Sequence, residues 1–161
     1  MQERLVAKIN DQLNKELYSG YVYLGMAACF EEAGLPGFAH WMKCQASEEQ
    51  EHAMKFFEYL VQRGERVRLA AIDEPRFEYD SALDAFEAGL EHEEYVTGLI
   101  DDLYKMALEA EDHAAAIFLQ WFVTEQVEEE ESFTKMRDDL RRLGDCEKGL
   151  YMLDRAAASR E

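Results

Sequence analysis

Residues that interrupt helices are scarce in this chain. Its 161 residues include only two prolines and nine glycines. The long stretches between them are rich in Ala, Leu, Glu, Gln, Lys and Met, which favour helices, so we expect an all-α fold. The length suits one domain that buries its core without help from disulfides, and we therefore treat residues 1–161 as a single domain.

Cysteines and long apolar runs are also few. Cys29, Cys44 and Cys146 are far apart and form no CxxC pair, which argues against a disulfide framework or a zinc knuckle and favours a reducing compartment. No apolar run approaches the roughly 18 residues of a membrane span. The first residues lack the basic-then-apolar layout of a signal peptide. We expect a cytoplasmic protein with no membrane partner.

Positive charge is in short supply. The chain has 17 basic and 35 acidic residues, which give a formal net charge of -18. Because this charge repels phosphates, we expect no nucleic-acid partner. The same charge attracts cations, so metal ions are reasonable partners. An acidic balance can also do no more than keep a helical protein in solution, and charge alone does not decide between these interpretations.

Turn and capping signals divide the chain into four long helices and a short one. Pro36 and Gly64 stand at helix boundaries, and residues 65–80 show no helical period. Ser81 begins a segment that resembles a capping box, and Gly144 ends the fourth long helix. The expected helices span residues 3–33, 37–63, 81–110, 112–143 and 146–157.

The lengths of these helices predict how they pack. Each long helix would span about 40–46 Å at a rise of 1.5 Å per residue, and the connection over 65–80 can cover that distance. Short turns make consecutive helices antiparallel within each pair. We therefore expect an antiparallel four-helix bundle with one long crossover between its second and third helices, followed by a short C-terminal fifth helix.

The core-facing stripe of each long helix is interrupted near its middle by polar side chains. Steps of three and four residues keep side chains on one buried face, and most residues on these stripes are apolar. Glu49 and His52 form a Glu-x-x-His pair whose side chains share one face. The interrupting residues, in chain order, are Glu16, Glu49, His52, Glu93, Gln126 and Glu129.

These interruptions predict a metal site. The midpoints of equally long helices lie at one height, so the six side chains should converge. Burying four carboxylates together would cost several kcal/mol each and would force them to bind protons, whereas two cations remove that penalty. Oxygen donors with one imidazole suit iron or manganese better than structural zinc. A single such glutamate usually reaches out to solvent, but four at one level favour a di-metal centre.

Several segments resemble the non-haem ferritins of prokaryotes. They are QLNKELYS at 12–19, EEQEH at 48–52, HE at 92–93, FLQWFVTEQVEEE at 118–130 and GLYMLDR at 149–155. The resemblance covers essentially the whole chain and makes the expected fold a ferritin-like bundle. It implies a ferroxidase that oxidises Fe(II) to Fe(III) with O2 or H2O2. The ferric iron would be stored as a mineral inside a shell of 24 subunits.

The resemblance also implies roles for individual residues. The first iron would be held by Glu16, Glu49 and His52, and the second by Glu93 and Glu129, with Glu49 bridging the two. Gln126 would lie close to the second iron, and Tyr23 would be placed to supply an electron. A third iron site would comprise Glu48, Glu125 and Glu128.

Departures from related families narrow the interpretation. Bacterioferritins and rubrerythrins carry a second Glu-x-x-His on the last long helix, where this chain has Gln126 and Glu129. We expect no haem, because Gln50 stands where bacterioferritin has its haem-binding methionine.

Two alternative functions stay open. One is another di-iron carboxylate enzyme, either an oxygenase or a peroxide-reducing protein. The other is a non-catalytic helical scaffold whose midplane polar residues fix the packing register.

Overall fold

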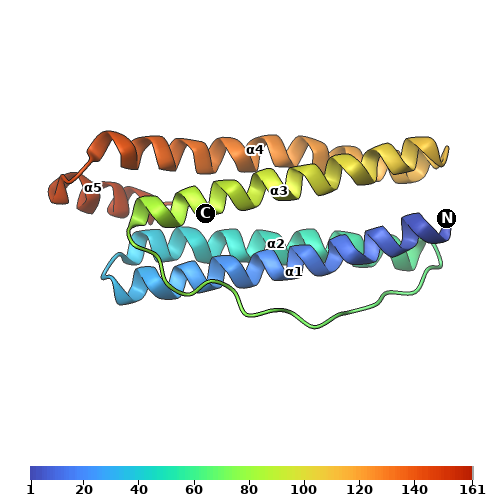
Figure 1. Ribbon diagram of the computed structural model, residues 1–161, viewed down its shortest axis with the longest axis horizontal. Helices are drawn as coiled ribbons and strands as arrows, with labels where there is room; N and C mark the ends of the chain where they lie inside the picture. The colour runs from blue at the N-terminus through green and yellow to red at the C-terminus, as the bar shows by residue number, and fades with distance from the viewer. Residues whose placement is uncertain (161) are drawn as a thin grey trace.

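The computed structural model describes residues 1–160, which form five α-helices and, within that range, no strand. Four helices are long and one is short. Their ends differ from the expected ones by no more than one residue. The prediction of a four-helix bundle with one crossover and a short fifth helix is confirmed (Figure 1). The helices are α1 (Glu3–Glu32), α2 (Pro36–Gln62), α3 (Ala82–Glu109), α4 (His113–Leu143) and α5 (Glu147–Ala157).

Capping side chains and glycines explain where the long helices begin and end. The Ser81 hydroxyl accepts a hydrogen bond from the Asp84 amide at 3.1 Å, which caps the start of α3. Asp112 caps α4 in the same way. Gly34 and Gly64 follow α1 and α2 with φ of 73° and 72°, a left-handed conformation that glycine adopts without steric penalty. Local sequence therefore sets the starts of α3 and α4 and the ends of α1 and α2.

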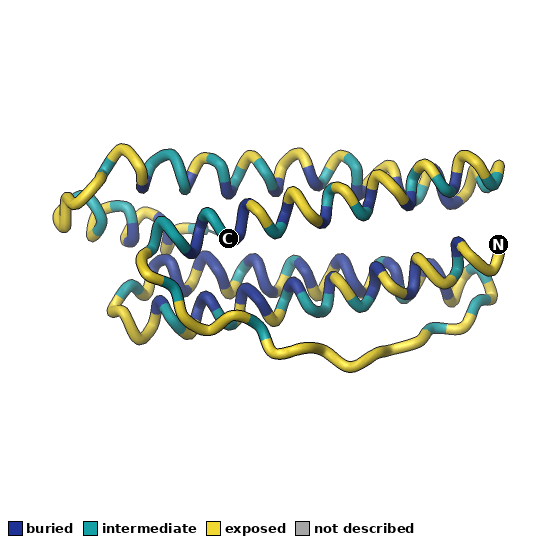
Figure 2. The backbone as a smooth tube through the Cα atoms, in the orientation of Figure 1, coloured by how far each residue is buried: buried dark blue, intermediate teal, exposed yellow. Residues whose placement is uncertain are grey.

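The bundle consists of two antiparallel hairpins. Helices α1 and α2 lie side by side, as do α3 and α4, and the crossover runs the length of the bundle beside α1 (Figure 1). Buried residues face the interior, whereas the crossover is mostly exposed (Figure 2). Within residues 1–160, no helix combines the length and the apolar character that a membrane crossing requires.

Two asparagines of α1 hold the crossover in its extended path. The Asn10 amide donates to the Arg66 carbonyl at 3.2 Å and accepts from the Arg68 amide at 2.6 Å. One helical turn later, Asn14 donates to the Arg68 carbonyl at 2.9 Å and accepts from the Ala70 amide at 2.7 Å. These two side chains provide hydrogen-bond partners for backbone N–H and C=O groups of the crossover, as a neighbouring strand would do in a sheet. The crossover itself has no secondary structure that could pair these groups.

Helix α5 docks on the first turn of α2. The Asp154 carboxylate, which is buried, accepts a hydrogen bond from the Phe38 backbone amide at 2.8 Å. The preceding residue must be glycine, because a Cβ on Gly37 would lie only 1.7 Å from the Asp154 carbonyl oxygen. A side chain from α5 thus caps α2, whose own N-cap residue makes no side-chain cap.

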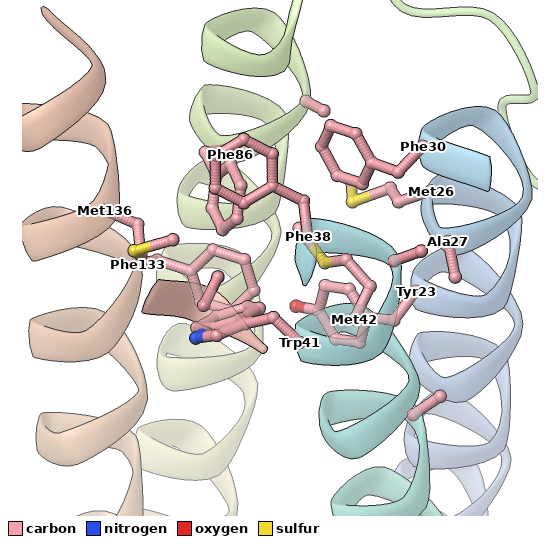
Figure 3. Close-up of a cluster of buried hydrophobic side chains, with 14 of the residues drawn as sticks. Tyr23, Met26, Ala27, Phe30, Phe38, Trp41, Met42, Phe86, Phe133 and Met136 are labelled. Atoms are coloured by element: carbon pink, nitrogen blue, oxygen red, sulfur yellow. The ribbon is translucent and has the colours of Figure 1, made fainter. Parts of the chain in front are cut away.

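The core is divided into two hydrophobic clusters with polar side chains between them. One cluster lies toward α5 and includes Phe38, Trp41, Phe86 and Phe133 (Figure 3). The other lies toward the N-terminus and is built from Leu5, Ile9, Phe56, Ile100, Leu119 and Phe122. Along each long helix, the six residues that interrupt the apolar stripe fall between the stretches that supply these clusters. The middle of the bundle is therefore the place where it can hold charge.

Candidate metal centre

All six interrupting residues point into the bundle. Each is at most 5% exposed, although four of them are carboxylates. One comes from α1, two from α2, one from α3 and two from α4, so every long helix contributes to the same level. The buried residues are Glu16, Glu49, His52, Glu93, Gln126 and Glu129.

The structure brings potential ligand atoms together in two groups that share His52. One group comprises Glu16, Glu49 and His52, with one ligand atom of each within 4.8 Å of the others. The second comprises His52, Glu125 and Glu129 under the same criterion. His52 Nδ1 lies 3.6 Å from Glu49 Oε2, and its Nε2 lies 3.8 Å from Glu125 Oε1. This imidazole therefore stands between the two hairpins of the bundle.

Glu93 is held differently from the other buried carboxylates. Within residues 1–160 it belongs to neither group, and its oxygens accept hydrogen bonds from two neighbours. The Tyr23 hydroxyl donates to Oε1, and Gln126 Nε2 donates to Oε2 at 3.1 Å. Burial, followed by the charge of Glu93, raises the pKa of Tyr23 well above its ordinary value. The tyrosine consequently stays protonated and acts as a donor.

Buried amides hold the remaining carboxylates. Gln12 Nε2 donates to Glu16 Oε1 at 2.9 Å. Gln45 Nε2 donates to Glu129 Oε2 at 2.7 Å and to Glu49 Oε1 at 3.3 Å. Neither amide was assigned a role from the sequence, although both stand four residues before a predicted ligand, a spacing that places side chains on one helix face. Hydrogen bonds of this kind, made to a ligand by a residue that does not itself bind the metal, orient metal ligands.

Burial makes the carboxylates of this centre hold their protons. It raises the pKa of Glu16, with the Glu49 charge as the next cause, and the pKa of Glu49, with Glu93 and Glu129 next. Burial likewise raises the pKa of Glu93 and of Glu129 from 4.5 to about 7. The mutual repulsion shows that carboxylates from different helices converge. Such a cluster favours cations that replace the protons.

The donor set fits iron. Four carboxylates and one imidazole provide hard oxygen ligands with a single nitrogen, which suits iron or manganese. Every buried side-chain nitrogen or oxygen within residues 1–160 has a hydrogen-bond partner. The polar band therefore holds its shape through its own hydrogen bonds, and the ligands are kept near their positions before any ion binds.

The residues predicted for a third iron site do not all gather. Glu125 reaches His52, as described above. Glu48 accepts a hydrogen bond from Arg160 Nη2 at 2.5 Å; burial raises its pKa, and the arginine charge partly offsets that effect. The Glu128 side chain is exposed and joins neither ligand group in the described part of the chain. The sequence did not predict that Arg160 contacts this site, because no local pattern indicates that contact.

Aromatic rings also contact residues of the centre. The Trp121 ring meets His52 edge-on at a centroid distance of 5.5 Å. Tyr23 stacks on Phe133 at 5.4 Å and meets His92 edge-on at 5.8 Å. Burial lowers the pKa of His92 to about 4, so this imidazole is neutral and does not add charge beside the carboxylates.

The bundle, its crossover and the carboxylate band define a ferritin-like metal-binding protein. Residues 6–143 match the family model described as a ferritin-like domain. The chain is 39% identical over 155 residues to a probable bacterial non-heme ferritin-like protein of Haemophilus influenzae, with 96% of this chain and 94% of the relative covered. It is 38% identical over 160 residues to a bacterial non-heme ferritin of Staphylococcus saprophyticus, with 99% and 96% covered.

Solved structures agree with the sequence relatives. An open pore ferritin from the hyperthermophilic archaeon Archaeoglobus fulgidus superposes with a TM-score of 0.99 at 45% identity, covering 100% of this chain and 99% of that one. The chain therefore belongs to the ferritin family, and the resemblance to prokaryotic non-haem ferritins that the sequence predicted is confirmed.

Proposed function

We propose that this chain is the subunit of an iron-storage protein that oxidises Fe(II) at paired positions within each bundle. The observation that carries the proposal is the convergence of four buried carboxylates and one imidazole from all four long helices. Membership of the ferritin family and the names of the bacterial non-heme ferritin relatives agree with it. Iron is the substrate and the cargo.

The assigned ligands divide between the two hairpins. Glu16, Glu49 and His52 would bind the first ferrous ion, and Glu93 and Glu129 the second, with Glu49 bridging. Gln126 fixes the Glu93 carboxylate by its hydrogen bond. Because carboxylates bind the higher charge more strongly, this site favours the ferric state.

The chemistry balances with either oxidant. Two ferrous ions give up two electrons, which with two protons convert O2 to H2O2 or H2O2 to two waters. Tyr23, which contacts Glu93, would supply one electron to the oxidant in place of one from iron, as the family resemblance implies. Ferric ions then hydrolyse to a mineral and release protons. Glu48, Glu125 and Glu128 would serve a third iron position.

Storage requires an enclosed space outside the single chain. We infer a hollow homo-oligomer of 24 subunits, as the family resemblance implies, and a cytoplasmic location in keeping with the free cysteines. The similarity to an open pore ferritin over the whole chain supports a shell. The formal net charge of -18 per chain would draw Fe(II) toward such a shell.

The alternative of a di-iron oxygenase finds less support. Such an enzyme would need room for an organic substrate beside the irons. A cavity of about 820 Å³ lies in the groove between α1, the crossover and α3, and its lining includes Lys8, Ile72 and Tyr95. None of the predicted ligands lines it. The geometry therefore favours a site that handles ions and small oxidants.

Aerobic addition of Fe(II) to the metal-free protein tests the proposal. We expect far more than two irons per chain to be taken up in soluble form, which a scaffold or an oxygenase would not do. Glu49→Gln combined with His52→Ala should slow oxidation by more than about tenfold. Changing a residue that only hydrogen-bonds to a metal ligand commonly lowers affinity or activity by that factor, and these two residues are assigned as ligands themselves. Absorbance of the ferric product measures the rate.

Glu51→Gln is the matched control. It removes the same charge from α2, but its side chain is exposed on the outer face of that helix. This variant should oxidise iron at the rate of the unaltered protein. Unchanged oxidation in the double variant, or uptake that stops at two irons per chain, would count against the assignment.

A further inference from the structure

Gln45 connects the predicted iron ligands to the segment that follows α5. It is fully buried, and its Nε2 contacts both Glu49 and Glu129. Its Oε1 points the other way and accepts a hydrogen bond from Arg160 Nη2 at 2.8 Å. A continuous hydrogen-bonded chain therefore runs from Arg160 through one amide to two carboxylates on different hairpins.

Several contacts with α2 fix the position of the Arg160 side chain. Its guanidinium lies over the Trp41 ring, with Cζ 4.1 Å from the centroid, and Nη1 reaches the Trp41 carbonyl at 3.4 Å. Its backbone carbonyl lies 2.8 Å from His40 Nε2. The Arg160 side chain is only 18% exposed. These contacts hold Arg160 against α2, next to the buried carboxylates.

The chemistry of arginine decides which way the amide faces. A guanidinium carries only donors, so the Gln45 group facing it must be the carbonyl oxygen. The NH2 group is consequently directed at Glu49 and Glu129, to which it donates hydrogen bonds. Without Arg160 the amide can rotate by half a turn and present its oxygen to the carboxylates, which would then lose the hydrogen bonds that orient them.

We propose that Arg160 is a positioning residue for the iron centre, acting through Gln45 to keep Glu49 and Glu129 oriented for metal binding. The proposal rests on the proposed function of that centre. It assigns the segment after α5 a part in metal affinity in addition to any part in packing.

Arg160 also contacts Glu48, which offers a second route for its effect. Nη2 lies 2.5 Å from Glu48 Oε2, and Glu48 is itself a predicted ligand of the third iron. An effect through Glu48 would be independent of Gln45. Substituting Gln45 or Glu48 one at a time distinguishes an effect through Gln45 from an effect through Glu48.

Titration of the full-length, metal-free protein with Co(II), followed by visible absorption, measures the affinity without turnover. Arg160→Met should weaken binding at the centre by about tenfold, the usual size of a lost outer-shell contact. Gln45→Leu should weaken it similarly. In the Gln45→Leu background, Arg160→Met should change the affinity less than about twofold, because the shared route is already cut.

Arg155→Met is the control, since Arg155 lies on exposed α5 surface and contacts only Tyr151 through its side chain among the described residues. It should leave the Co(II) titration unchanged. Unaltered affinity in Arg160→Met would overturn the inference, and so would equal losses in the presence and absence of Gln45. An effect of Arg160→Met that disappears in Glu48→Gln would do the same.

Failure of the underlying function gives a different result. If the unaltered protein showed no Co(II) spectrum sensitive to Glu49→Gln, the centre itself would not bind metal, and both proposals would fall. A normal spectrum in the unaltered protein with no response to Arg160→Met would overturn only the positioning role.

Discussion

At the scale of single residues, Gly89 of α3 shows how closely the side chains next to the centre pack. A Cβ placed there would lie 2.3 Å from Cε1 of Phe133. Phe133 stacks on Tyr23 and meets Trp41 edge-on at 4.9 Å, and both residues belong to the cluster next to the carboxylates (Figure 3). The missing side chain therefore makes room for the ring that supports Tyr23.

Gly89→Ala should lower the free energy of unfolding by about 1–3 kcal/mol, the usual cost of overpacking a close-packed core. This loss would exceed the gain of up to about 1 kcal/mol that alanine brings to a helix. Gly98→Ala in the same helix is the matched control, because nothing lies within 4 Å of its added Cβ. Denaturant unfolding should shift in opposite directions for the two variants; shifts of the same sign would refute this account.

The same scale shows which site residues a sequence can reveal. Glu16 and Glu93 were predicted because they break an apolar helical period, and that period is a local property. Gln12 and Gln45 also carried a local signal, their spacing of four residues from a ligand, which was not used. Arg160 carried none, since its contacts with Trp41, Gln45 and Glu48 span 112 to 119 positions of the chain.

At the scale of elements, periodicity and capping predicted the helices but not how the other segments attach. The crossover has no period of its own, and its path depends on Asn10 and Asn14, whose side chains pair with its backbone. Neither asparagine stands out in sequence. The docking of α5 depends on a hydrogen bond between Asp154 and Phe38, which are 116 positions apart.

Asp154→Ala should loosen α5 from the bundle. The change leaves the buried Phe38 amide at the start of α2 without its acceptor, which should cost about 1–2 kcal/mol. We expect a lower unfolding midpoint and faster hydrogen exchange at Phe38. Asp145→Ala is the control, because Asp145 is exposed before α5. Unchanged exchange at Phe38 in Asp154→Ala would show that α5 is held by other contacts.

At the scale of the whole molecule, the centre lies where the two hairpins meet. Glu16, Glu49 and His52 come from the α1–α2 hairpin, and Glu93 and Glu129 from the α3–α4 hairpin. Without metal, the four carboxylates repel one another across this seam as they lose their protons. Bound cations would join the two halves, so metal binding and global stability should be coupled.

For the metal-free protein we predict an unfolding midpoint that falls as the pH rises from about 5 to about 8. The pKa of Glu93 and of Glu129 is about 7 in the folded chain, against an ordinary 4.5. Their stabilising contribution is complete below the unfolded pKa, because the folded state binds the protons more tightly. It is lost as the pH rises through about 7. The loss should be on the order of a few kcal/mol.

Thermal unfolding at several pH values, with and without Co(II), measures this coupling. Glu129→Gln should flatten the decline, whereas Glu131→Gln removes an exposed charge from the same helix and should leave the slope unchanged. Co(II) should raise the midpoint more at pH 8 than at pH 5, because protons compete for the ligands at the lower pH. A metal-free midpoint that holds steady or rises between pH 5 and 8 would mean that the buried carboxylates do not repel one another as described.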